Sequence, residues 1–148
     1  MQRYENNPVV RPLDVKPSRA ELKVVCAFNA AAIEHEGQIL LLLRVAETAG
    51  ESEPGYISFP VVEQSESGPV VALKAVRKDS PELDDSDPRM IIYKDEPFLM
   101  TLSHLRLARS SDGRDFTVDE GPTMLPMSTV EAFRRSNKYT RRVFAGFA

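Results

Sequence analysis

The segment from Ser103 to Phe116 constrains the fold of this chain more than any other stretch, because it reads as a strand that enters a turn. Its apolar and polar residues alternate at nearly period two, which is typical of a half-buried strand. The dipeptide Asp112-Gly113 that follows is a strong turn signal, because glycine accepts the positive φ of a tight turn. The apolar set is Thr101, Leu105 and Leu107, and the polar set is Ser103, His104 and Arg106.

Two further segments upstream repeat this pattern of short apolar strands separated by turns. Residues 24–45 contain two apolar runs on either side of Glu36-Gly37, which predicts a hairpin. Residues 90–93 and 98–102 form a second pair of runs around the turn at residues 94–97. Short strands at regular intervals, with loose repetition of the units, predict an all-β repeat architecture such as a propeller.

Composition limits the class of protein. A chain of 148 residues corresponds in length to a single domain, and its 42% hydrophobic content is enough to form a core. The formal net charge of −3 gives no basic excess that would favour nucleic acid as a partner. The single cysteine, Cys26, lies in an apolar run, where we expect a reduced and buried thiol. The first residues lack the apolar core of a signal peptide, so we expect a cytoplasmic protein and no membrane contact.

Several segments, taken in order, resemble glycoside hydrolase family 130. The members of this family are five-bladed β-propellers, and many of them are phosphorylases or hydrolases of β-mannosides. The resemblance extends to about Phe133 and implies a partial five-bladed propeller of about two to three blades of antiparallel strands. The segments that carry it are residues 6–12, 28–33, 40–45, 87–89 and 103–116.

The resemblance also implies a set of substrate-binding residues. Asn29 matches the asparagine of a Phe-Asn-Pro-like motif, although Ala30 replaces its proline. Arg44 matches the arginine that contributes to phosphate binding in the phosphorylases, and a planar guanidinium can hold two phosphate oxygens at once. His104 and Arg106 would add polar groups to the same region. Inorganic phosphate is the expected co-substrate, with an oligosaccharide as substrate and no metal or other cofactor.

The family's catalytic motif, Gly-x-Glu-Asp-x-Arg, is expected after Phe133 and does not occur there. A weaker candidate for the reacting acid is Asp87, in the sequence Asp-Pro-Arg, although it lies one unit too early and lacks the preceding glutamate. All 22 acidic residues and 14 of the 19 basic residues precede residue 134, whereas the last 15 residues hold five basic residues. We therefore divide the chain into a propeller portion, 1–133, and a basic tail, 134–148. Two explanations of this charge distribution are open: a disrupted reading frame, or a genuine short basic tail.

These observations support two functions of different classes. The first is transfer of a β-mannosyl group to phosphate, or its hydrolysis, by a truncated and catalytically impaired chain. The second is a non-catalytic fragment that binds carbohydrate or phosphate. The residues also have purely structural interpretations: Asn29 as a turn residue, Arg44 as a rim residue and His104 as a packed side chain. Open strand edges in an incomplete propeller predict self-association.

Overall fold

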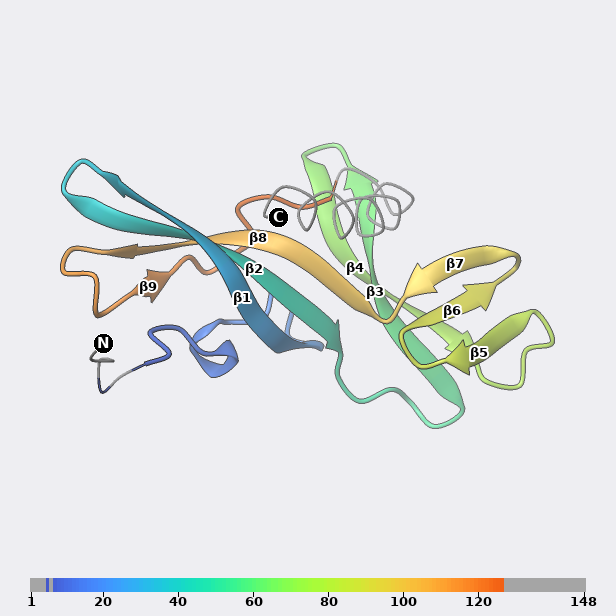
Figure 1. The fold of residues 1–148 in the computed structure, drawn as a ribbon. Coiled ribbons are helices and arrows are strands. Elements are labelled where there is room, and N and C mark those ends of the chain that lie inside the picture. The colour runs from blue at the N-terminus through green and yellow to red at the C-terminus, as the bar shows by residue number, and fades with distance from the viewer. Residues whose placement is uncertain (1–4, 6, 127–148) are drawn as a thin grey trace, which may run out of the picture.

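The computed structural model describes residue 5 and residues 7–126, and its regular structure is almost entirely antiparallel β-strand (Figure 1). The predicted all-β fold class is thereby confirmed. The expected basic tail, 134–148, and its boundary with the propeller portion lie outside the described residues. The elements are a 3₁₀ turn η1 (Pro12–Asp14) and the strands β1 (Leu22–His35), β2 (Gln38–Ala49), β3 (Tyr56–Ser65), β4 (Gly68–Arg77), β5 (Leu83–Asp87), β6 (Met90–Tyr93), β7 (Glu96–Leu99), β8 (Thr101–Ser110) and β9 (Thr117–Val118).

The largest sheet has four strands in the order β1-β2-β8-β9. Its first two strands form the predicted hairpin, and the turn residues Glu36 and Gly37 have φ values of 50° and 74°. Positive φ at both central residues is the requirement of a type I′ turn, which suits the twist of a two-residue hairpin. The turn residues Glu36 and Gly37 in the sequence therefore predicted the position of this hairpin correctly.

Strands β2 and β8 are neighbours in this sheet although some fifty residues separate them along the chain. Their register is unbroken from Ile39 opposite Ser110 to Thr48 opposite Thr101. The intervening chain builds two smaller sheets, the hairpin β3-β4 and the three-stranded meander β5-β6-β7. Figure 1 shows the two small sheets gathered at one end of the molecule and the large sheet extending from them.

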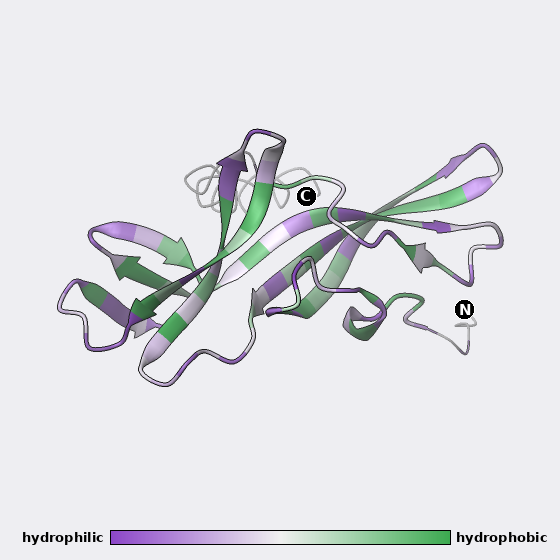
Figure 2. Cartoon of the chain, turned by 180° about the vertical axis from the view of Figure 1, so that it is seen from behind, coloured by the Kyte–Doolittle hydropathy of each residue, from purple (hydrophilic) through white to green (hydrophobic). Residues whose placement is uncertain are grey.

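Two hydrophobic cores hold these sheets together. The first, built on Phe59, lies between the small sheets, and the second lies between the large sheet and the N-terminal segment, residues 7–20. Figure 2 shows hydrophobic residues along the middles of the strands and hydrophilic residues at the hairpin ends. The buried members are Phe59, Val61, Val76, Ile91 and Phe98 in the first core, and Val15, Leu43, Val45 and Ala108 in the second.

Three consecutive antiparallel sheets agree with the expected partial propeller, in which each sheet packs on its neighbour. Two local expectations were wrong. The run 98–102 is divided, because β7 ends at Leu99 and β8 begins at Thr101 in another sheet. Cys26, expected to be buried, is exposed on the edge strand β1, because an irregularity of the pairing between Val24 and Cys26 interrupts the alternation that would place it on the face of Leu22. In the described part of the chain, no helix is long and apolar enough to cross a membrane.

The burial pattern of β8 differs most from expectation. Leu105 and Leu107 are only half-buried, whereas His104 and Arg106 on the alternate positions are 3% and 0% exposed. The strand is amphipathic as predicted, but its polar side chains face the N-terminal segment. Charged side chains are rarely buried unless they are paired, so this face needs a partner of opposite charge.

Candidate functional site

Arg44 and Asn29 lie close together on the hairpin of β1 and β2. Arg44 is paired across the strands with Phe28, and its Cζ atom lies 5.4 Å from the centre of the Phe28 ring. Among the described residues, the Arg44 guanidinium makes no hydrogen bond and no ion pair. The ring thus supports a half-buried cation whose N–H donors remain available to a ligand.

Asn29 follows Phe28 at an irregularity of β1. The pairing steps from Phe28 opposite Arg44 to Ala31 opposite Leu42, so Asn29 and Ala30 share one position against β2. Asn29 is exposed and has a φ of 51°, a left-handed conformation that asparagine tolerates better than most residues. Bulges redirect side chains and occur often beside active sites, which is consistent with the role that the sequence predicts for Asn29.

His104 and Arg106 lie on the other face of the same sheet. In the ladder between β2 and β8, Arg44 is paired with Leu105, whereas Val45 is paired with His104. Directly paired residues share a face and successive residues alternate between faces. The structure therefore does not bring the four predicted binding residues together: Asn29 directly follows Phe28, the cross-strand partner of Arg44, whereas His104 and Arg106 form a separate buried pair.

Glu47 of β2 is the partner that the buried pair requires. Its Oε2 atom lies 3.5 Å from Nε2 of His104, and its Oε1 atom lies 3.7 Å from Nη2 of Arg106. All three side chains are fully buried. Burial raises the pKa of Glu47, but the interactions with His104 and Ser18 outweigh this effect, so the pKa lies below the usual range of glutamate. Glu47 is thus a carboxylate at neutral pH.

The same cluster fastens the N-terminal segment to the sheet. The backbone N–H of Ser18 donates to Oε1 of Glu47 at 2.7 Å, and the Ser18 hydroxyl donates to Oε2. Nη1 of Arg106 donates to the carbonyl oxygen of Lys16 and, at 3.4 Å, to that of Glu120. We call Ser18, Glu47, His104 and Arg106 the buried polar cluster. Sequence reasoning missed Glu47 and Ser18, although Glu47 continues the alternation of Leu43 and Val45.

The cluster has one electrostatic consequence for its arginine. Burial lowers the pKa of Arg106, while the negative charges of Glu47 and Asp119 act in the opposite direction. Nε and Nη2 of Arg106 and both ring nitrogens of His104 have no hydrogen-bond partner among the described residues. The negative charge of Glu47 therefore stabilises the buried Arg106 through its short distance, although no hydrogen bond joins the two side chains.

Asp87 lies at the end of β5, away from both groups. Its carboxylate accepts hydrogen bonds from the Arg89 side chain at 2.7 and 3.0 Å and from the Arg89 backbone N–H at 2.9 Å. The Arg89 side chain is the main reason why the pKa of Asp87 is lowered to about 2. A general acid must hold a proton near the working pH, and this environment favours the ionised form.

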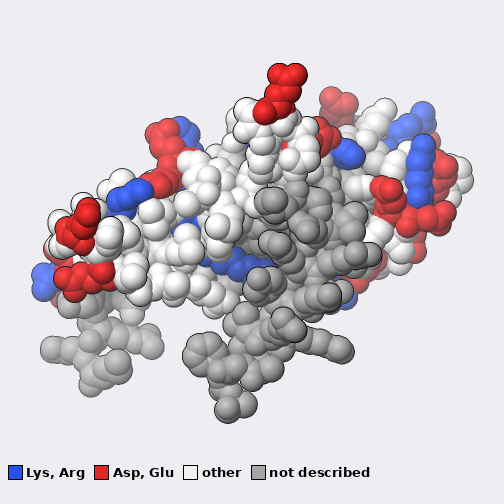
Figure 3. All heavy atoms as spheres, turned by 90° about the horizontal axis from the view of Figure 1, so that it is seen from above, with Lys and Arg blue, Asp and Glu red and all other residues white. Residues whose placement is uncertain are grey.

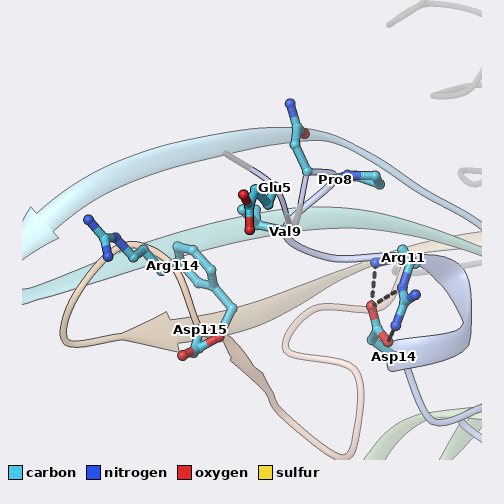
Figure 4. Close-up of a pocket in the computed structure, with 9 residues that line it drawn as sticks. Glu5, Pro8, Val9, Arg11, Asp14, Arg114 and Asp115 are labelled. Carbon is cyan, nitrogen blue, oxygen red and sulfur yellow. Dashed lines mark hydrogen bonds and ion pairs between the residues drawn. The ribbon is translucent and has the colours of Figure 1, made fainter. Parts of the chain in front are cut away.

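One hollow of about 530 Å³ opens between the N-terminal segment and the loop after β8 (Figure 4). None of the predicted site residues lines this hollow. The lining residues are Glu5, Asn7, Pro8, Val9, Arg11, Asp14, Arg114, Asp115 and Phe116.

The charged side chains of the surface are mixed in sign. Figure 3 shows Lys, Arg, Asp and Glu intermixed toward both ends of the molecule on the face that the figure presents.

Comparison with known proteins gives one clear relationship. No protein-family model matches the chain. Over 135 residues, 88% of this chain, it is 40% identical to the β-1,2-mannobiose phosphorylase of Listeria innocua serovar 6a and covers 38% of that protein. A solved structure of β-1,2-mannobiose phosphorylase from Listeria innocua, in complex with β-1,2-mannobiose, matches with a TM-score of 0.64 and 41% identity.

The structural match covers 85% of this chain and 36% of the solved one. The chain therefore spans less than two fifths of the length of this relative, and the shared part is the N-terminal part. Sequence identity of this size, together with the shared fold, confirms the resemblance on which the site residues were assigned. The matched stretch of this chain is homologous to the N-terminal part of a glycoside hydrolase family 130 protein.

Proposed function

We propose that the chain is a β-mannoside phosphorylase-like protein, in which Arg44 and Asn29 bind phosphate and the sugar beside it. The overall reaction would break the bond between the anomeric carbon and the glycosidic oxygen. It would form a bond from that carbon to phosphate or to water, and the proton would go to the departing sugar. The support comes from the similarity to the Listeria phosphorylase and from the geometry of the β1-β2 hairpin.

The single observation that carries the proposal is the unpaired guanidinium of Arg44. Most other described arginines are engaged with acidic side chains, as Arg11 is with Asp14 and Arg77 with Asp79. Arg44 instead lies over an aromatic ring, in a position that leaves its fork of donors open. A planar guanidinium recognises two phosphate oxygens at once, and Asn29 beside it offers both a donor and an acceptor to a sugar hydroxyl.

His104 and Arg106 take a different part in this proposal. Both side chains are buried and face Glu47, so we infer that they support the site by holding β2 against β8 and the N-terminal segment. Inorganic phosphate remains the proposed co-substrate. The reacting acid remains unassigned, since the environment of Asp87 keeps it ionised.

Phosphate binding by the purified chain tests the role of Arg44. Calorimetric titration with inorganic phosphate should show binding that Arg44→Ala weakens at least about tenfold, because an arginine-phosphate contact contributes roughly 1.5–3 kcal/mol. Arg77→Ala is the control, since Arg77 is also an arginine of a hairpin strand but is exposed and paired with Asp79. Equal binding by the wild type and Arg44→Ala would remove Arg44 from the site.

A phosphorolysis assay separates the two functions. The purified chain, incubated with β-1,2-mannobiose and inorganic phosphate, should release mannose 1-phosphate if it is catalytically competent by itself. Binding of phosphate and sugar without product would favour the non-catalytic function. The environment of Asp87 favours that second outcome, because no proton donor has been identified among the described residues of the predicted site. Product that is lost in Asp87→Asn would instead reinstate Asp87 as the acid.

A further inference from the structure

The hollow between the N-terminal segment and the loop after β8 joins two parts of the chain that are far apart in sequence. One wall consists of Glu5 and of residues within 7–14, and the other consists of Arg114, Asp115 and Phe116. Figure 4 shows the labelled Glu5, Pro8 and Val9 on one side and the loop that carries Arg114 and Asp115 on the other. Its volume of about 530 Å³ lies within the range of about 300–1,000 Å³ that is usual for small-molecule sites.

Hydrogen bonds order the loop wall and the stretch of chain that directly follows the N-terminal wall. The buried polar cluster fastens the N-terminal segment through Lys16 and Ser18. In the loop, the Asp112 carboxylate accepts the backbone N–H groups of Arg114 at 2.9 Å and Asp115 at 3.1 Å. These backbone hydrogen bonds are the main reason why the pKa of Asp112 is lowered to about 2, so the carboxylate that accepts them is ionised at neutral pH. A preformed cavity costs its ligand little ordering energy.

The charges of the lining decide between classes of ligand. Arg11 is neutralised by Asp14, with Nη2 to Oδ1 at 2.9 Å. The lining also holds the carboxylates of Glu5 and Asp115, two negative charges that a single further cation of the lining, Arg114, does not balance. This balance repels phosphate. It suits a neutral polyhydroxylated molecule, because a carboxylate accepts hydrogen bonds from two hydroxyl groups and the amide of Asn7 can donate to others.

Phe116 adds an apolar surface to this polar lining. It lines the hollow and also packs against the second core, so the position of its ring is fixed. Sugars combine a ring of hydroxyl groups with faces of C–H groups, and a lining that holds both an aromatic side chain and carboxylates matches both features. From these residues the geometry points to a saccharide-binding site in this hollow, which takes a neutral mono- or disaccharide and does not require phosphate.

The test is a titration of the full chain with β-1,2-mannobiose in phosphate-free buffer, followed by calorimetry. Asp115→Asn and Phe116→Leu should each weaken binding about tenfold, which is the loss expected for one charge-assisted hydrogen bond or for most of one apolar contact. Asp79→Asn is the matched control, because Asp79 is an exposed carboxylate paired with Arg77. It lies in the loop between β4 and β5 and does not line the hollow. That control should bind as the wild type does.

The same titration distinguishes this site from the proposed role of Arg44. Arg44→Ala should leave phosphate-independent sugar binding unchanged, because Arg44 does not line the hollow. If Arg44→Ala abolishes the binding while Asp115→Asn, Phe116→Leu and Glu5→Gln retain it, the saccharide-site inference is overturned and the proposed function stands. Absence of any binding to the folded wild-type chain, up to the solubility limit of the sugar, also overturns it.

Discussion

Arg106 of β8 lies with its Nη2 atom 3.7 Å from Oε1 of Glu47 on β2, and both side chains are fully buried. The same carboxylate accepts the backbone N–H of Ser18 at 2.7 Å. One glutamate thus joins two strands of the large sheet to the segment that covers them. Since the covering segment also forms one wall of the hollow, the interior charge and the candidate saccharide site are structurally linked.

Replacement of Glu47 should destabilise the fold strongly. Glu47→Ala leaves Arg106 buried without a counter-charge, and removal of one partner of a buried pair typically costs about 3–5 kcal/mol in the free energy of unfolding. Glu63→Ala, an exposed glutamate at the end of β3, serves as the control and should change stability little. Urea denaturation of the three proteins measures the difference. A loss for Glu47→Ala no larger than for the control would show that the cluster is dispensable.

Stability should fall as the solution becomes acidic. The pKa of Glu47 is lower in the folded chain than in the unfolded one, and the pKa of Asp112 is lowered to about 2. Groups with depressed pKa values stabilise the fold above their unfolded pKa values, about 4, and lose this contribution as pH falls through the folded values. The melting temperature should therefore decline between about pH 5 and pH 2. Asp112→Asn should flatten this decline, and an unaltered slope would contradict the role of Asp112.

Gly113 should not tolerate a side chain. Its φ is 71°, and a Cβ atom there would lie 2.8 Å from Cδ1 of Ile39. We expect Gly113→Ala to lower the free energy of unfolding by at least about 1 kcal/mol, because alanine is strained at positive φ. Gly121→Ala is the control, since a Cβ atom there meets nothing within 4 Å. Equal melting temperatures of the two variants would mean that the loop adjusts without cost.

The chain should associate with itself at high concentration. Strand β1 is at one end of the sheet order, and it carries exposed Val25 and Ile33, which are 43% and 64% exposed. Edge strands with apolar side chains favour pairing between molecules. Light scattering over a range of concentrations should show growing mass, and Ile33→Lys should reduce it. A monodisperse monomer at every concentration would contradict this expectation.

Much of the fold could be predicted from the sequence, because turn-forming residues between apolar runs mark several of its hairpins. Glu36-Gly37 lies between two apolar runs, and the runs alone sufficed to place β1 and β2. Strand β3 was not predicted, and Pro60 in its middle is a residue that sequence rules place outside central strands. Among the described residues β3 pairs with β4 alone, so one of its edges has no neighbouring strand, and edge strands tolerate a residue without a backbone N–H.

The candidate site was predicted less well, and for a physical reason. Alternation within β8 shows that the strand has two faces, but it does not show which face another segment covers. That depends on Glu47 and on the N-terminal segment, which reach β8 from distant parts of the sequence. Arg44 and Arg106 were therefore grouped together, whereas the register of β2 and β8 assigns them to opposite faces.

The adjacency of β2 and β8 has a consequence for the order in which the molecule forms. Thr48 and Thr101 are paired, so the large sheet cannot close until the residues between them have been brought into a loop. Contacts between residues so distant in sequence slow folding, because the loop entropy is lost before the contact is gained. During synthesis, the hairpin β1-β2 and the small sheets can form first. The large sheet, with its buried glutamate, is completed only after β8 leaves the ribosome.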